Sequence, residues 1–287
     1  MIDSWFTGHT VALLGWVHGN EPSGISAIMK LLQSIRMGNL SLMRGKLILI
    51  PVSNPLAHAH WLRYVEKDLN RSFRRDFVSP MYKEERLAQD IMSILSDHDV
   101  SLLLDLHSTS GPSAPFLFCE KPNLSLWALF GVRYIITWWS TLGNWVLSWD
   151  VENYMNSFSG KMGFTFESGN HESPVGEKNA YQMALNFLVR CDMIGQSNFL
   201  PLHPETTVLD MKRVYILEWN DFAYSIPRIE SFIFIEEWMN KIGYSIANDW
   251  KKTPIYADPW DILIMPKLWE ICCGDEVFFL WTICKEE

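Results

Sequence analysis

The chain has 287 residues, of which 48% are hydrophobic and 14% aromatic, with a formal net charge of −9 and a pI near 5.4. This composition excludes an intrinsically disordered chain and supplies enough apolar side chains for one large domain or two smaller ones. The acidic balance argues against general binding to nucleic acid or to an anionic membrane, while a locally basic pocket for an anionic substrate is compatible with it.

Cysteine usage and the absence of targeting signals indicate a cytoplasmic protein. The five cysteines include no CxxC pair, which favours reduced and mostly buried thiols. The first residues lack the basic region and apolar run of a signal peptide. The stretch most like a membrane span, residues 126–149, contains Arg133, and its charge-free part is 16 residues long. Because a spanning helix needs roughly 20 apolar residues, we expect no membrane insertion, but a buried strand followed by a core helix.

Strand-like and helix-like segments alternate over about the first 195 residues. Short apolar runs predict strands at 10–17, 47–52, 101–106, 133–138 and 163–166. Proline and cap signals with helical spacing of apolar residues predict helices from Pro22 to about Gly38, from Ser79-Pro80 to Leu95, and over 177–191. This alternation predicts an α/β fold, with a mostly parallel sheet flanked by helices on both faces.

The composition changes at about residue 204. From there the chain shows short strand-like runs, VYILEW, SFIFI and VFFLW, separated by turn signals. Such a pattern is typical of an antiparallel β structure. We therefore expect two domains, an α/β catalytic domain over 1–203 and a smaller β-rich domain over 204–287 that caps the active site.

Three side chains that bind metals follow predicted strands. His18 and Glu21 come after the first strand, and His107 comes after the third. In open α/β sheets ligands bind beyond the carboxyl ends of the strands, so the fold can bring these residues together. Two histidines and one glutamate are a ligand set of catalytic zinc. A histidine at a strand end is more often a hydrogen-bonded structural residue, and an HxxE pair alone is a weak signal, so both interpretations stay open at this point.

A polar cluster lies between the metal-ligand candidates in the sequence and comprises Arg63, Asn70 and Arg71. Arginine forms bidentate bonds to carboxylates, and asparagine adds an amide donor. Arg63 is also a candidate to stabilise an oxygen that becomes negative in a transition state. Because Arg74 and Arg75 follow at once, a solvated basic segment explains the same spacing equally well.

Glu167 is a candidate general base, because it ends the apolar run GFTFE and is followed by Ser-Gly. Partial burial would raise its pKa and make it a better proton acceptor near neutral pH. Glu172, five residues further on, is a rival. His171-Glu172 does not form an HExxH motif, because position 175 is valine. The chain also lacks the Walker A, GxGxxG and GxSxG signatures of nucleotide-binding proteins and serine hydrolases.

Four segments, in this order, resemble the succinylglutamate desuccinylase and aspartoacylase family, which is related to the zinc carboxypeptidases. They are HGNEPSG, NPLAHAHWLRYVEKDLNRSFRRDF, DLHST and GFTFESG. Together they cover most of the first 195 residues, and four motifs in the right order are far more specific than any one of them. The separation of Glu21 from His107 also resembles the deacylase branch more than the carboxypeptidases, in which that gap is longer.

The resemblance implies a zinc-dependent hydrolase that cleaves the amide bond of a small anionic N-acyl amino acid, such as N-succinylglutamate or N-acetylaspartate. One zinc ion per chain would be held by His18, Glu21 and His107. Glu167 would serve as general base and then as general acid. Arg63 would polarise the scissile carbonyl, and Asn70 and Arg71 would bind the substrate carboxylate.

The chain departs from the family pattern at several positions. Aspartoacylases carry an arginine about ten residues before the catalytic glutamate, where this chain has Ser157, and the run after the glutamate also differs. The acyl group and the amino acid therefore stay unassigned. A carboxypeptidase-like peptidase, an esterase using the same site, and a binding protein without catalysis are the alternatives. A homo-oligomer is compatible with this sequence, which does not define the number of subunits.

Overall fold

The computed structural model describes most of the first 216 residues and short strands beyond them. The described ranges are 1–75, 79–119, 130–137, 150–216, 223–224, 233–234, 247–248, 254–255, 262–264 and 276–283. Residues 138–149, where a core helix was expected to follow a strand, lie outside these ranges, as do Cys272, Cys273 and Cys284. The thiols of Cys119 and Cys191 are buried, as expected.

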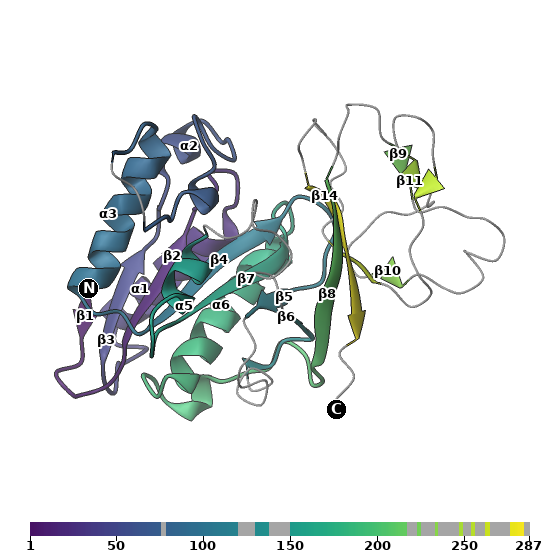
Figure 1. The fold of residues 1–287 in the computed structure, drawn as a ribbon. Coiled ribbons are helices and arrows are strands. Elements are labelled where there is room, and N and C mark those ends of the chain that lie inside the picture. The colour runs from purple at the N-terminus through teal and green to yellow at the C-terminus, as the bar shows by residue number, and fades with distance from the viewer. Residues whose placement is uncertain are drawn as a thin grey trace.

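One mixed sheet dominates the described part of the chain (Figure 1). Its strands lie in the order β1-β3-β2-β4-β7-β5-β6-β8-β14-β13-β10. The first eight in this order are β1 (Ile2–Asp3), β3 (Lys46–Ile50), β2 (Thr10–Gly15), β4 (Leu102–Thr109), β7 (Met162–Asn170), β5 (Phe116–Phe118), β6 (Tyr134–Thr137) and β8 (Thr207–Ile216). Parallel pairing joins β3 to β2, β2 to β4, β4 to β7, β5 to β6, and β6 to β8. The prediction of a mostly parallel sheet is confirmed.

The C-terminal part of the described chain is antiparallel β structure. The strands β14 (Glu276–Ile283), β13 (Ile262–Ile264) and β10 (Ile233–Phe234) continue the sheet beyond β8. A separate small sheet contains β9 (Ala223–Tyr224), β11 (Ala247–Asn248) and β12 (Pro254–Ile255). Three of these strands, β8, β10 and β14, overlap the predicted runs VYILEW, SFIFI and VFFLW. The division into domains 1–203 and 204–287 stays a prediction.

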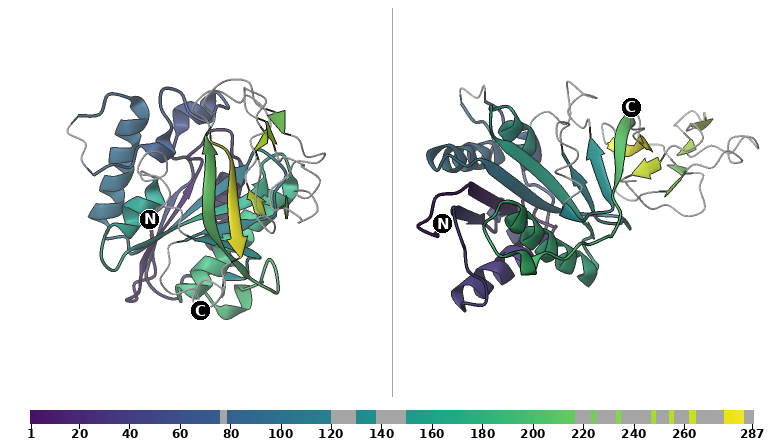
Figure 2. Two further views of the ribbon diagram at one scale, coloured as in Figure 1. Left: turned by 45° about the vertical axis from the view of Figure 1, so that its right-hand side comes forward. Right: turned by 90° about the horizontal axis from the view of Figure 1, so that it is seen from below.

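Helices cover both faces of the sheet, as the views in Figures 1 and 2 show. Two long helices, α1 (Ser23–Arg36) and α6 (Pro174–Arg190), pack on one face. The other face carries α3 (Lys83–Asp97) and α5 (Val151–Asn156). Side chains along β2 alternate between these layers, because neighbouring residues of a strand point to opposite faces: Val11 and Leu13 face α1 and α6, and Ala12 and Leu14 face α3. None of the helices in the described ranges has the length and apolar character needed to cross a bilayer.

The start of α3 and the end of β4 differ from the prediction, as do the end of β7 at Asn170 and the start of α6 at Pro174. The second long helix, α3, begins at Lys83 rather than directly after Ser79-Pro80. Its start is set by Glu85, whose carboxylate accepts hydrogen bonds from the backbone N–H groups of Met81 and Tyr82. Strand β4 does not end before His107 but continues to Thr109, because β7 pairs with it along its whole length. His107 therefore lies on a strand and not in a loop.

Three short elements complete the described part of the chain. The helix α2 (Pro55–Ala59) and the 3₁₀ turn η1 (Leu69–Arg71) follow β3, and the 3₁₀ turn η4 (Gln196–Asn198) follows α6. Asn54 caps α2 by accepting a hydrogen bond from the N–H of Ala57 at 3.1 Å. Helix α2 follows β3 directly and lies near the top of Figure 1.

Glycines in the segment HGNEPSG allow backbones to approach each other closely. A Cβ atom at Gly19 would collide with the backbone of Ala57 and His58 in α2. A Cβ atom at Gly24 would lie 2.6 Å from the carbonyl oxygen of Leu106 on β4. Since these neighbours are backbone atoms, rotation of a side chain cannot relieve the contact. The two glycines therefore fix the loop between β2 and α1 against α2 and β4.

We expect Gly19→Ala to lower the free energy of unfolding by about 2 kcal/mol or more, because overpacking against backbone forces the chain to move. The measurement is urea unfolding of the variant beside the wild type. Gly195→Ala is the matched control, since a Cβ atom there would meet its nearest neighbours at 3.8 Å. Equal stability of the two variants would contradict the close packing of α2 on the loop.

Asp150 caps α5 and is buried. Its carboxylate accepts hydrogen bonds from the backbone N–H and the side-chain amide of Asn153 at 2.7 and 2.9 Å. Burial raises the pKa of Asp150 to about 6, although the bonds from Asn153 and the charge of Arg71 act to lower it. Because the folded form binds its proton more tightly than the unfolded form, ionisation of Asp150 destabilises the protein.

We therefore expect Asp150 to make the protein less stable as the pH rises from about 4 to about 6, by up to about 3 kcal/mol. In Asp150→Asn, an equally good helix cap, this loss should be absent. Unfolding free energies of both proteins across this pH range measure the difference. Parallel pH profiles of wild type and variant would contradict the raised pKa.

Candidate metal centre

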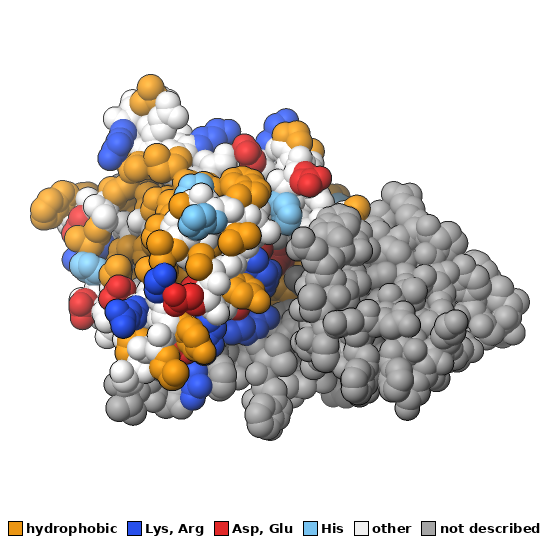
Figure 3. All heavy atoms as spheres, turned by 90° about the horizontal axis from the view of Figure 1, so that it is seen from above, with side chains coloured by type: hydrophobic (Ala, Val, Ile, Leu, Met, Phe, Trp, Pro, Cys, Tyr) orange, Lys and Arg blue, Asp and Glu red, His pale blue; other side chains and the backbone are white. Residues whose placement is uncertain are grey.

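Three side chains from two neighbouring strands meet at one edge of the sheet. His18 and Glu21 lie in the loop between β2 and α1, and His107 lies near the end of β4. Since β2 and β4 are parallel neighbours, with Gly15 opposite Leu106, their carboxyl ends lie side by side. All three side chains are buried. Figure 3 looks onto the molecule from above, where the histidine side chains that can be seen lie at the surface among hydrophobic ones, whereas His18 and His107 are buried.

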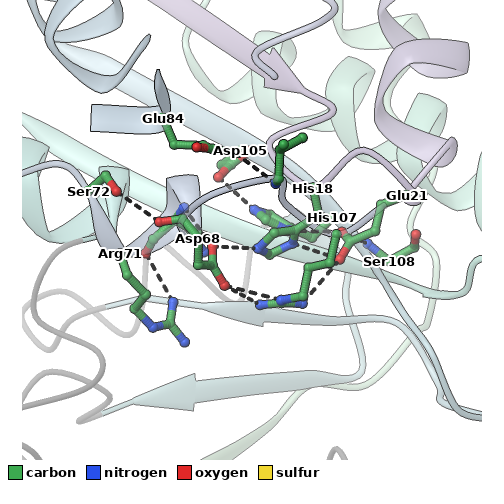
Figure 4. Close-up of polar contacts among 12 residues, drawn as sticks. His18, Glu21, Asp68, Arg71, Ser72, Glu84, Asp105, His107 and Ser108 are labelled. Atoms are coloured by element: carbon green, nitrogen blue, oxygen red, sulfur yellow. Dashed lines mark hydrogen bonds and ion pairs between the residues drawn. The ribbon is translucent and has the colours of Figure 1, made fainter. Parts of the chain in front are cut away.

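The carboxylate of Glu21 lies between the two imidazole rings (Figure 4). Its Oε1 is 2.7 Å from Nδ1 of His18, and its Oε2 is 3.0 Å from Nδ1 of His107. The backbone N–H of Ser108 also donates to Oε2, at 3.0 Å. One atom from each of the three side chains lies within 4.8 Å of the others. Two imidazole nitrogens and a carboxylate oxygen thus converge on one small volume.

A second carboxylate lies behind each imidazole. Nε2 of His107 is 2.7 Å from Asp105, and Nε2 of His18 is 3.2 Å from Asp68. Histidine ligands of metals commonly donate their other N–H to a carboxylate, which fixes the tautomer and leaves the ligating nitrogen unprotonated. Here that arrangement would leave both Nδ1 atoms available on the side of Glu21.

The charges of the cluster stabilise one another. Burial acts to raise the pKa of Glu21, but the two adjacent imidazoles hold it well below its usual range. For His107, burial acts to lower the pKa, and the carboxylates of Asp105 and Glu21 raise it well above its usual range. The cluster therefore favours positive charge at its centre. A buried set of two nitrogens and one carboxylate oxygen fits a divalent cation such as zinc.

Glu167 lies on β7 directly beside His107 of β4. Its side chain is buried, and its Oε2 has no hydrogen-bond partner among the described residues. Burial raises the pKa of Glu167 to about 8, and the negative charge of Glu21 adds to this effect, while His107 and Arg63 oppose it. Glu172, the rival candidate, is exposed on the turn after β7. The geometry thus favours Glu167 as the proton acceptor at this site.

Arg63 lies against the metal-ligand cluster rather than in a solvated segment. Its guanidinium donates from Nε and Nη2 to Oδ2 of Asp68, both at 3.1 Å. Its Nη1 is 3.7 Å from Oε1 of Glu21. About half of the side chain is exposed, at 46%. Arg63 therefore combines a fixed position beside the cluster with access to a ligand from solvent.

Asn70 and Arg71 form η1 directly after Asp68. The Asp68 carboxylate caps this turn by accepting the N–H of Asn70 at 2.8 Å. The guanidinium of Arg71 donates to the carbonyl oxygen of Asn70 at 3.0 Å. Oδ1 of Asn70 is buried without a hydrogen-bond partner among the described residues. The turn therefore presents an amide and a guanidinium on the segment that also carries Arg63 and Asp68.

Asp68 and Asp105 contact the two histidines, but no role was predicted for either residue from the sequence. Asp105 lies two positions before His107 on a strand, where residues two apart share one face, and this spacing is a signal that could have found it. Asp68 is 50 positions from His18 and carries no such local signal. Its pKa, which burial acts to raise, is held well below the usual range by Arg63 and His18.

Comparison with known proteins relates this site to a family of deacylases. Residues 7–136 match the model of the succinylglutamate desuccinylase/aspartoacylase catalytic domain. N-acyl-aromatic-L-amino acid amidohydrolase (carboxylate-forming) of Xenopus tropicalis is 30% identical over 124 residues, 40% of this chain and 39% of the relative. The Homo sapiens protein of the same name is 32% identical over 124 residues, 39% of this chain and 37% of the relative. The match thus spans less than half of the length of these relatives.

Solved structures match over almost the whole chain. Succinylglutamate desuccinylase from Vibrio parahaemolyticus superposes with a TM-score of 0.72 at 17% identity, over 97% of this chain and 82% of that one. A succinylglutamate desuccinylase/aspartoacylase from Rhodobacter sphaeroides superposes with a TM-score of 0.73 at 18% identity, over 98% and 87%. These identities are low, so the superpositions show the fold. The sequence of residues 7–136 is thus similar to the succinylglutamate desuccinylase/aspartoacylase catalytic domain, and the chain shares the fold of these solved structures.

Proposed function

We propose that the protein is a zinc-dependent amidohydrolase that cleaves the amide bond of a small N-acyl amino acid. The observation that carries this proposal is the buried group of His18, Glu21 and His107, in which both Nδ1 atoms and one carboxylate converge next to Glu167. A site with three protein ligands leaves a coordination position open for water or substrate, as catalytic zinc sites do. Arg63 and Glu167, from the second and fourth motifs, lie beside Glu21 and His107 of this group, which supports the proposal.

Each residue of the site has a chemical role in the proposed reaction. Zinc held by the three ligands supplies Lewis-acid activation of water and of the scissile carbonyl. Glu167 accepts the proton of the attacking water and later delivers it to the leaving nitrogen, a task that suits a buried carboxylate with a raised pKa. Arg63 stabilises the carbonyl oxygen as negative charge develops on it. Asn70 and Arg71 bind the carboxylate of the amino-acid part.

The similarity to the family, and one departure from the family's sequence pattern, narrow the choice of substrates to test. Candidates include N-succinylglutamate and N-acetylaspartate, and the relatives' name adds N-acyl-aromatic amino acids. Ser157, which takes the place of an arginine, is exposed at the end of α5, and its hydroxyl donates to the carbonyl oxygen of Tyr154 at 2.7 Å. Since serine at this position supplies no cation for a second carboxylate, a substrate panel needs to include neutral and aromatic N-acyl amino acids.

We expect the zinc-loaded protein to hydrolyse at least one member of such a panel, and Glu167→Gln to bind zinc but lose turnover by about a hundredfold or more. Release of the free amino acid measures the reaction, and metal analysis measures zinc. Glu172→Gln is the control, and its activity should equal that of the wild type because Glu172 is exposed. Full activity in Glu167→Gln would exclude Glu167 as the base. Cleavage of peptides or esters alone would favour a peptidase or an esterase, and zinc binding without any turnover would favour a binding protein.

We expect His107→Ala to lose zinc and turnover together, because one of the three ligands is removed. Zinc content after dialysis and the rate of hydrolysis test this expectation. His98→Ala is the control, since this histidine is exposed at the end of α3. Retention of stoichiometric zinc by His107→Ala would place the metal elsewhere.

A further inference from the structure

A buried carboxylate at the start of α3 binds the backbone of a separate loop. Glu84 is fully buried, with 0% of its surface exposed. Its Oε1 accepts hydrogen bonds from the N–H groups of Val65 and Glu66, at 2.8 and 3.1 Å. Its Oε2 accepts a hydrogen bond from the N–H of Lys67 at 3.3 Å. Three consecutive backbone donors thus point at one carboxylate.

The loop that Glu84 binds is the segment that carries the polar residues of the metal centre. Arg63 precedes the three bound N–H groups, and Asp68 follows them directly. Both residues contact the ligand cluster, Arg63 through Asp68 and Glu21, and Asp68 through His18. The carbonyl oxygen of Arg63 also accepts the N–H of Gly19 at 3.3 Å, next to His18. The position of this loop therefore sets the positions of the groups that surround His18.

Other contacts between the loop and α3 use flexible side chains. Lys67 reaches Glu85 with its ammonium group at 2.6 Å. The carboxylate of Glu66 binds the N–H and the ammonium group of Lys83, at 2.9 and 3.0 Å. A long side chain accommodates small movements of the backbone that carries it. Glu84, by contrast, is buried and accepts its hydrogen bonds from the loop backbone itself.

We propose that Glu84 is a positioning residue of the metal centre: it holds residues 65–67 so that Asp68 orients His18 and Arg63 lies beside Glu21. Figure 4 shows Glu84 together with Asp68, His18 and Glu21. The effect of Glu84 on turnover rests on the proposed function. Its effect on the metal ligands does not depend on the substrate, because Asp68 contacts the imidazole of His18.

Glu84→Gln tests the role of the carboxylate with little change of shape. Glutamine keeps one acceptor oxygen and replaces the other by an NH₂ group, which faces a backbone N–H and cannot accept from it. A buried donor then loses its partner, and the loop must shift to find another. Changes to groups that orient metal-bound histidines weaken metal affinity or activity by about 10- to 100-fold. For Glu84→Gln we expect zinc affinity and kcat/KM each to fall by about tenfold.

Glu85→Gln is the matched control. Glu85 is the next residue of the same helical turn, is also buried, and accepts the N–H groups of Met81 and Tyr82. Loss of either carboxylate removes hydrogen bonds from backbone N–H groups to a buried side chain, so thermal unfolding should report a similar loss of stability. Only Glu84→Gln should weaken zinc binding, measured by competition with a chromophoric chelator. Glu84→Asp, which keeps the charge on a shorter side chain, provides a second variant if glutamine prevents folding, and it should bind zinc more weakly than the wild type.

The results separate this proposal from the proposed function. A Glu84 variant that folds, loses as much stability as Glu85→Gln and keeps the zinc affinity of the wild type would overturn the positioning role. A wild type that binds zinc but hydrolyses no N-acyl amino acid would overturn the proposed reaction, while the comparison of zinc affinities would still decide the role of Glu84. The positioning role of Glu84 would be supported by weaker zinc binding in Glu84→Gln together with unchanged zinc binding in Glu85→Gln.

Discussion

The contact of one carboxylate with two imidazoles is the interaction around which the candidate site is built. Glu21 lies between His18 and His107 in a buried place, where an isolated charge would be very unfavourable. The carboxylate is tolerated because both imidazoles and the backbone N–H of Ser108 contact it, and the imidazoles in turn contact Asp68 and Asp105. The pairing of β2 with β4 brings these groups together, so the sheet and the charge pattern depend on each other.

The carboxylates of the site are of two kinds, which differ in the direction in which their surroundings shift the pKa. Asp68 has its pKa held well below the usual range by Arg63 and His18, and Glu21 by its two imidazoles. Glu167, a few ångströms along the sheet on the next strand, has its pKa raised because burial dominates over its partners. Environments that push the pKa values of neighbouring carboxylates apart are typical of sites where one group binds and another transfers protons. This contrast supports different roles for residues of the same chemical type.

Much of the fold was predictable because parallel sheets are buried on both faces, and their strands stand out as continuous apolar runs. For that reason the sequence predicts strands β2, β3 and β4 and the helices on either side of them. The start of α3 was not predictable from Ser79-Pro80, because the side chain of Glu85 determines it from inside the helix.

The site was predictable where its residues follow strands or belong to a motif. His18, Glu21 and His107 could be found from the strand ends, and Glu167 from the apolar run before it. Asp68 could not be assigned a role, because its contact with His18 joins positions far apart in the chain. Glu84 was also beyond reach, since a helical glutamate normally lies at the surface and nothing local indicates that this one binds a distant backbone.

The placement of the site residues has a consequence for how such a protein can be diversified. The metal-ligand candidate His107 and the base candidate Glu167 lie on adjacent strands inside the sheet, where a change in one strand disturbs its neighbours. One contiguous segment carries Arg63, Asn70 and Arg71, and hydrogen bonds join this segment to the start of α3. The same segment carries Asp68, which contacts His18, so its exchange or lengthening would disturb the metal ligands together with the residues proposed to bind substrate. Selectivity and metal binding are therefore coupled through this segment, and they would have to change together, in evolution or by design.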